Sequence, residues 1–218
     1  MATVYTIGHS TRSLDELLTV LKAHEIRRLV DIRAFPVSRR LPHFSRESLE
    51  TALPAAGICY SWMKELGGYR KKILEHSPNL ALRNAAFRHY ADYMMTPEFE
   101  KAVGQLVGLA QGSRLACMCA ERVWFHCHRM LVSDWLVAHG NPVQHIDGEG
   151  AAKPHYVSRQ AKWQGEQLIY CGDALFPERT QVTIAPANAQ RASRRREAVK
   201  AAKRTSTDCG GQVSLKFP

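Results

Sequence analysis

The chain lacks the features that would place it in a membrane or outside the cell. It contains no leading apolar segment with a cleavage site and no long uncharged apolar run. A secretory signal peptide and a membrane-spanning helix require these features. The 218 residues are 45% hydrophobic and 23% charged, which is typical of a globular domain. We therefore predict a cytoplasmic protein with no membrane partner.

The sequence is also poor in metal-binding cysteine motifs, because no Cys-x-x-Cys pairs complete a tetrahedral set of ligands. Three of the six cysteines fall between positions 117 and 127. A core of this size needs no disulfides, so the clustering indicates site chemistry or core packing. A zinc site from Cys119, Cys127 and His128, with or without His126, is disfavoured because successive side chains diverge. We predict no metal and no cofactor.

Acidic residues are scarce near the C-terminus. Eight bases and two acids follow Thr180, so this segment carries +6 of the net charge of +10. Its bias towards Ala, Gln, Ser, Arg and Lys predicts a flexible, basic tail over residues 180–218, after a domain over residues 1–179. Basic charge favours polyanionic partners, whereas a tail that only increases solubility is the alternative.

Strand and helix patterns alternate along the rest of the chain, and no internal repeat occurs. Strands are predicted at residues 3–7, 29–33, 58–62, 115–119 and 143–146. Helices are predicted after Ser13, after Ser45 and over residues 84–95, 97–111 and 129–139. This alternation predicts an α/β fold, a single compact three-layer domain with a mostly parallel sheet of about five strands.

Several short motifs with unusual residue types lie at the ends of these elements. They are Thr6-Ile7-Gly8-His9-Ser10, Asp31-Ile32-Arg33 with Pro36 and Ser38-Arg39-Arg40, Leu66-Gly67-Gly68, Cys119-Ala120-Glu121 with Cys127-His128-Arg129, and His145-Ile146. With these motifs the chain resembles the domain-of-unknown-function family 488 over residues 4–146. The resemblance implies a compact α/β fold and the position of a site, but no particular reaction.

The unusual residues follow strands that are far apart in sequence. Gly8-His9-Ser10 follows the first strand, Asp31 and Arg33 end the second, and Cys119 to Arg129 follow the fourth. Ligands bind at the carboxyl ends of the strands in a parallel α/β sheet. Because these segments converge on that edge, we predict a composite site there.

The chemistry of this predicted site favours an anion. Guanidinium groups of Arg33, Arg39 and Arg129 match phosphate oxygens, and Cys127 and His128 lie at a predicted helix start. We predict a phosphate-bearing small molecule or a nucleic acid as partner. The candidate ligand-binding residues are Gly8, Ser10, Asp31, Arg33, Ser38, Arg39, Gly67, Gly68, Cys119, His128 and Arg129. Alternatively, Arg33 and Arg129 pair with Asp31 and Glu121 in a structural network.

Three residues are candidates for catalysis. Glu121 and His9 are the candidate general acid and base, and Cys127 is a candidate nucleophile or a small packed residue. The same sequence also fits a non-catalytic nucleic-acid-binding module or a thiol-redox or metal-linked protein. Trp124 and Phe125 either stack on a ligand ring or anchor their loop. The sequence does not determine whether the protein is an enzyme, nor its oligomeric state.

Overall fold

A computed structural model describes residues 1–171, and the predicted basic tail lies outside these residues. Six strands form the main sheet in the order β3-β2-β4-β1-β5-β6. The first five strands are parallel, as predicted, and β6 is antiparallel to β5. The strands of this sheet are β1 (Val4–Gly8), β2 (Arg28–Asp31), β3 (Cys59–Trp62), β4 (Leu115–Cys119), β5 (Val143–Ile146) and β6 (Lys153–Pro154).

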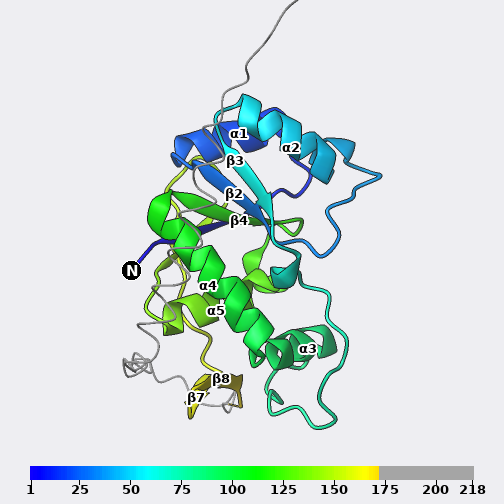
Figure 1. The fold of residues 1–218 in the computed structure, drawn as a ribbon, viewed down its shortest axis with the longest axis vertical. Coiled ribbons are helices and arrows are strands. Elements are labelled where there is room, and N and C mark those ends of the chain that lie inside the picture. The colour runs from blue at the N-terminus through cyan, green and yellow to red at the C-terminus, as the bar shows by residue number, and fades with distance from the viewer. Residues whose placement is uncertain (172–218) are drawn as a thin grey trace, which may run out of the picture.

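Helices cover both faces of the sheet, which confirms the predicted three-layer α/β architecture (Figure 1). One face carries α1 (Leu14–Ala23) and α2 (Arg46–Ala55). The other face carries α3 (Ala85–Met94), α4 (Pro97–Gly112) and α5 (Arg129–Ala138). Three short 3-10 helices lie in the connections, namely η1 (Pro42–Phe44), η2 (Lys64–Leu66) and η3 (Trp124–His126).

The side chains of β4 show why the sheet needs helices on both faces. Leu115 and Cys117 pack into the core under α3, α4 and α5, whereas Ala116 and Met118 pack into the core under α1 and α2. All four are buried. Strands of a parallel sheet are buried on both faces, so β4 is apolar at successive positions rather than at alternate ones.

Local signals set the helix boundaries as the sequence predicted. Ser13 forms the capping box of α1, because its hydroxyl accepts from the Glu16 amide at 3.2 Å and its amide donates to the Glu16 carboxylate at 2.6 Å. Thr96 caps α4, with Pro97 in the first turn. Gly57 follows α2 with a φ of 78°, a left-handed conformation that glycine adopts without strain.

The segment after β5 contains strands that the sequence did not reveal. β6 is only two residues long and both are exposed, so it leaves no hydrophobic pattern. The hairpin of β7 (Ala161–Gln164) and β8 (Gln167–Tyr170) turns at Gly165, which has a φ of 59°. A glycine between two short alternating runs is a hairpin signal that sequence reasoning missed.

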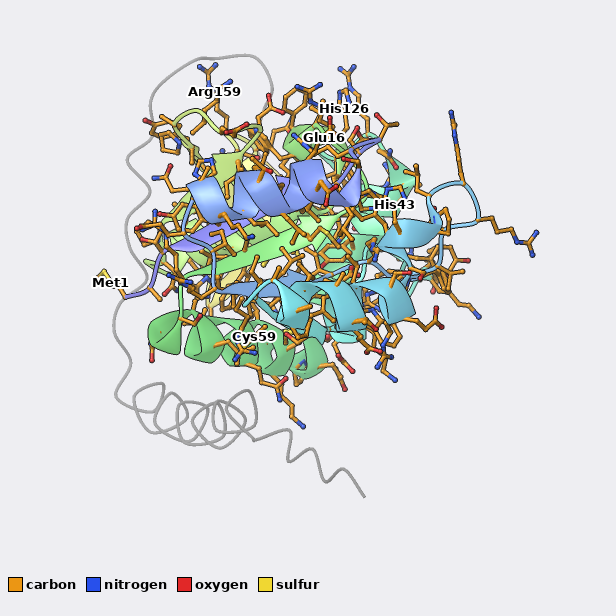
Figure 2. All side chains as sticks on the ribbon, turned by 90° about the horizontal axis from the view of Figure 1, so that it is seen from above. Met1, Glu16, His43, Cys59, His126 and Arg159 are labelled. Carbon is orange, nitrogen blue, oxygen red and sulfur yellow. The ribbon has the colours of Figure 1, made fainter. Side chains whose placement is uncertain are left out.

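The two ends of the parallel strands face opposite sides of the molecule (Figure 2). Met1 precedes β1 and marks the amino ends, while His43 follows β2 and lies on the side of the carboxyl ends. The predicted site belongs to the second of these sides. Within residues 1–171, the helices are too short or too polar to cross a bilayer.

Candidate functional site

The loops after β1 and β4 are joined at the carboxyl edge of the sheet. Gly8 pairs with Cys119 in the strand register. Beyond it, the His9 amide donates to the Cys119 carbonyl and the Ser10 amide donates to the Ala120 carbonyl, each at 2.9 Å. Two predicted site segments that are more than a hundred residues apart are therefore held together by backbone hydrogen bonds.

The end of β2 contributes a buried ion pair. The Nη2 of Arg33 lies 2.5 Å from Asp31 Oδ2, and its Nε donates to both carboxylate oxygens. Asp31 is fully buried and Arg33 is 6% exposed, and the Tyr60 hydroxyl also donates to Asp31 at 2.9 Å. The charge of Arg33 is thus compensated by a carboxylate two residues earlier, at the end of β2, as the alternative of a structural network expected.

His9 lies between this ion pair and Phe44 of η1. Its Nδ1 donates to the Ser10 carbonyl at 2.9 Å, its Nε2 accepts from Arg33 at 3.3 Å, and its ring stacks on Phe44. Burial, opposed in part by the Ser10 hydrogen bond, lowers the pKa of His9 to about 4. The ring is therefore neutral at pH 7 and both of its nitrogens are occupied.

The three predicted glycines lie where the chain passes close to itself. An added Cβ would lie 2.0 Å from the Glu121 carbonyl oxygen at Gly8, and 2.4 Å from Nδ1 of His128 at Gly68. At Gly67 it would lie 2.7 Å from Cα of Ala34. Close approach of other parts of the chain accounts for all three glycines, whatever ligand binds nearby.

Ser38 and Arg39 belong to the loop between β2 and α2. The Ser38 hydroxyl accepts from the Leu41 amide at 2.9 Å, which stabilises the turn. Arg39 is exposed, whereas Arg33 and Arg129 are buried. The three predicted arginines therefore differ in their access to solvent.

Two thiols and an imidazole meet where β4 ends and α5 begins. The Sγ atoms of Cys119 and Cys127 and a ring nitrogen of His128 all lie within 4.8 Å of one another. A hydrogen bond from Cys119, together with His128 and Arg129 nearby, holds the pKa of Cys127 well below that of an ordinary thiol. The pKa of Cys119 is raised correspondingly, because its thiol donates to Cys127. Cys117 points into the core instead, and burial raises its pKa to about 12.

Arg129 is the most deeply buried cation of the site, with 1% of its surface exposed. Its Nη2 donates to the backbone carbonyls of Glu121 and Arg122, and among residues 1–171 its Nε has no hydrogen-bond partner. The exposed Glu121 carboxylate instead accepts from the Val123 amide at 3.3 Å, so the alternative of an Arg129–Glu121 ion pair is wrong. Within residues 1–171, none of the ion pairs includes Arg129.

A cavity of about 390 Å³ opens beside Arg129. It lies between the loop after β4 and the carboxyl end of β5. Its lining residues are Arg122, Val123, Trp124, Phe125, Arg129, His145, Ile146, Asp147 and Lys153. Three cations and one carboxylate therefore contribute to the walls, together with two aromatic rings.

A fourth cation, Arg12, contacts a residue of the cavity lining. Arg12 donates to the backbone carbonyls of Gly8 and Asp147, which ties the loop after β1 to the end of β5. Burial, followed by the charge of Arg122, lowers the pKa of Arg12. Arg12 and Arg122 lie outside the sequence motifs. Nothing in the sequence places them together, because it does not reveal that β1 lies between β4 and β5.

A chain of buried hydrogen bonds holds His145, which lines the cavity. Asp134 accepts from Nε2 of His155, whose Nδ1 accepts from Nε2 of His145, each at 2.9 Å. The Thr6 hydroxyl donates to Nδ1 of His145 at 2.7 Å. Trp124 stacks on His145 at 4.2 Å with ring planes 6° apart, so this tryptophan anchors its loop. Burial, and next the neighbouring His155, lowers the pKa of His145 to about 3.

Comparison with known proteins identifies a family but no characterised relative. No curated protein and no solved structure matches the chain. The sequence profile of the family described as "Domain of unknown function DUF488" matches residues 13–136, which span α1 to α5 and include the loops of the site after β2 and β4. The chain therefore belongs to the DUF488 family.

Proposed function

We propose that the protein binds a small phosphate-bearing anion, such as a nucleotide, in the cavity beside Arg129. The observation that carries the proposal is the buried Arg129 guanidinium, which has no acidic partner within residues 1–171 and a vacant Nε. A buried charge without a counter-charge is costly, and a bound phosphate would compensate it. Guanidinium groups bind phosphate oxygens two at a time.

The walls of the cavity support this ligand class. Arg122 and Lys153 add two exposed cations, whereas Asp147 is the one carboxylate of the lining and already pairs with Arg122 at 3.0 Å. The lining thus keeps a net positive charge, which attracts anions. Its volume of about 390 Å³ suits a small molecule better than a helix or a duplex.

The aromatic residues of the lining favour a ligand with a ring. Phe125 is 50% exposed, and its ring meets that of Trp124 edge to face at 5.3 Å. An exposed aromatic ring beside phosphate-binding cations is the arrangement that binds a base and its phosphate together. A nucleotide combines both groups, whereas inorganic phosphate would use only the cations.

A thermal-shift screen of the full chain tests the proposal. The probes are pyrophosphate, AMP, ATP and a single-stranded DNA 12-mer, each compared with sodium chloride of equal ionic strength. A ligand at a hundred times its Kd adds about 2.7 kcal/mol, which raises Tm by roughly 5–10 °C for a domain of this size. We expect the largest rise with a nucleotide.

Two lysine variants provide the matched comparison. Lys153→Ala removes a cation from the cavity wall, and Lys162→Ala removes an exposed cation from β7. The ligand-induced shift should shrink in Lys153→Ala and persist in Lys162→Ala. The proposal fails if no phosphate compound stabilises the protein or if both variants respond alike. Stabilisation by the DNA 12-mer alone would instead favour a nucleic-acid-binding module.

A further inference from the structure

The cluster of Cys119, Cys127 and His128 is separate from the lining of the cavity and has a composition of its own. Its three donor atoms come from the end of β4 and the start of α5, and all lie within 4.8 Å of one another. Cys127 and His128 are buried, and Cys119 is half-buried. Thiolate sulfur and imidazole nitrogen are the preferred ligands of Zn²⁺ in proteins.

The backbone removes the main objection to this ligand set, which is that adjacent side chains diverge. Cys127 is extended, with φ of −128° and ψ of 153°, whereas His128 is helical, with φ of −56° and ψ of −14°. The change of conformation turns both side chains to one side, and Cys127 Sγ lies 3.4 Å from His128 Nδ1. Zinc bond lengths place sulfur and nitrogen ligands roughly 3.6 Å apart in a tetrahedron, close to this distance.

His128 is also held in the tautomer that a metal requires. Its Nε2 lies 3.0 Å from the carbonyl oxygen of Ile32, which can only accept, so Nε2 carries the proton. In the neutral ring, Nδ1 then presents its lone pair towards the thiols. Ligating histidines are typically oriented in this way by a backbone carbonyl on the second nitrogen.

Gly68 packs closely against the ring of His128. An added Cβ would lie 2.4 Å from His128 Nδ1, so only glycine fits at this position without displacing the ring. Within residues 1–171, no fourth cysteine, histidine or carboxylate joins the group. A three-residue set leaves one coordination position for water or a ligand, as in catalytic rather than structural zinc sites.

Neighbouring charges are compatible with a thiolate site. The guanidinium groups of Arg33 and Arg129 both act on Cys119, and Arg129 also acts on Cys127. Cations favour the deprotonated thiols that bind metals. Two thiolates carry two negative charges and so neutralise a divalent ion beside these arginines. We propose that Cys119, Cys127 and His128 form a binding site for a thiophilic divalent metal ion such as Zn²⁺.

Cobalt titration of the reduced, chelator-treated full chain tests this site without any phosphate ligand. Tetrahedral thiolate coordination gives Co²⁺ an intense charge-transfer absorption in the near ultraviolet, which Zn²⁺ abolishes when it displaces the cobalt. We expect one equivalent of Co²⁺ to bind with this absorption. Each of Cys119→Ser, Cys127→Ser and His128→Gln should weaken Zn²⁺ binding by more than about 100-fold.

Two further variants keep the outcome unambiguous. Cys171→Ser removes an exposed thiol outside the cluster and should leave binding unchanged. Gly68→Ala removes no ligand but forces the His128 ring to move, so it should weaken binding as well. Absence of the charge-transfer band in the wild-type protein would overturn the proposal. Unchanged Zn²⁺ binding in both folded cysteine variants would also overturn it. The same holds if the two thiols form a Cys119–Cys127 disulfide but bind no metal when reduced.

Discussion

The charges of two buried arginines at the carboxyl edge of the sheet are compensated to different degrees. Arg33 has Asp31 at 2.5 Å, so its charge is compensated before any ligand arrives. Within residues 1–171, Arg129 has only backbone carbonyls as hydrogen-bond partners, and its Nε is vacant. Carbonyl dipoles stabilise a cation less than a carboxylate does, so Arg129 retains more capacity for an anionic partner.

Gly8 provides a test of the packing that brings these loops together. Gly8→Ala would place a Cβ 2.0 Å from the Glu121 carbonyl oxygen, so one of the two backbones has to move. We expect it to lower the free energy of unfolding by about 3 kcal/mol or more in urea denaturation.

Gly104→Ala is the matched control, because among residues 1–171 no atom beyond the adjacent turns of α4 lies within 4 Å of its added Cβ. This substitution should raise the free energy of unfolding by about 0.5–1 kcal/mol, since alanine is the better helix former. Equal effects of the two substitutions would contradict the close approach at Gly8.

The elements of the fold were predictable where each carries its own local signal. The capping box at Ser13, the Thr96-Pro97 start and the apolar run of β4 are all set by neighbours in sequence. The Arg33–Asp31 pair is local in the same sense, because its two members are only two residues apart in sequence. β6 was missed because two exposed residues carry no periodicity.

The cavity was not predictable for a different reason. Arg12, Arg122 and Lys153 meet only because β1 lies between β4 and β5, and periodicity does not reveal strand order. The Cys127 thiol and the His128 ring lie close together because the backbone conformation changes between these two residues. The sequence does not reveal this change. Elements with a local signal could therefore be predicted from the sequence, whereas the grouping of side chains from distant segments could not.

At the scale of elements, the capping box gives a prediction for α1. Ser13→Ala removes the hydroxyl that accepts from the Glu16 amide, so the helix start loses a hydrogen bond. We expect a loss of about 1 kcal/mol in the free energy of unfolding, measured by urea denaturation. Thr19→Ala, at an exposed position inside the same helix, should leave stability unchanged or slightly raised. An unchanged stability in Ser13→Ala would contradict the assigned cap.

For the whole molecule, two buried histidines predict a dependence of stability on pH. The pKa values of His9 and His145 are lowered to about 4 and about 3, from 6.5 in the unfolded chain. The unfolded state therefore binds more protons below pH 6.5, and stability falls as the pH drops towards 4. Each histidine should cost about 2 kcal/mol between pH 7 and pH 5.

Chemical denaturation at several pH values measures this dependence. His145→Gln should show a shallower loss of stability between pH 7 and pH 5 than the wild-type protein. His126→Gln, which changes an exposed histidine in η3, should reproduce the wild-type slope. Identical slopes in all three proteins would rule out His145 as a source of the effect.

The central claim is that the cations beside Arg129 bind phosphate, and a calorimetric titration of the full chain with pyrophosphate tests it most directly. Arg122→Ala removes an exposed cation of the cavity that pairs with Asp147, and Arg114→Ala removes an exposed cation at the amino end of β4 that pairs with Glu25. We predict that Arg122→Ala raises Kd by about tenfold, which corresponds to about 1.4 kcal/mol, and that Arg114→Ala leaves it unchanged. Absence of binding to the wild-type protein, or equal losses in the two variants, would contradict the account.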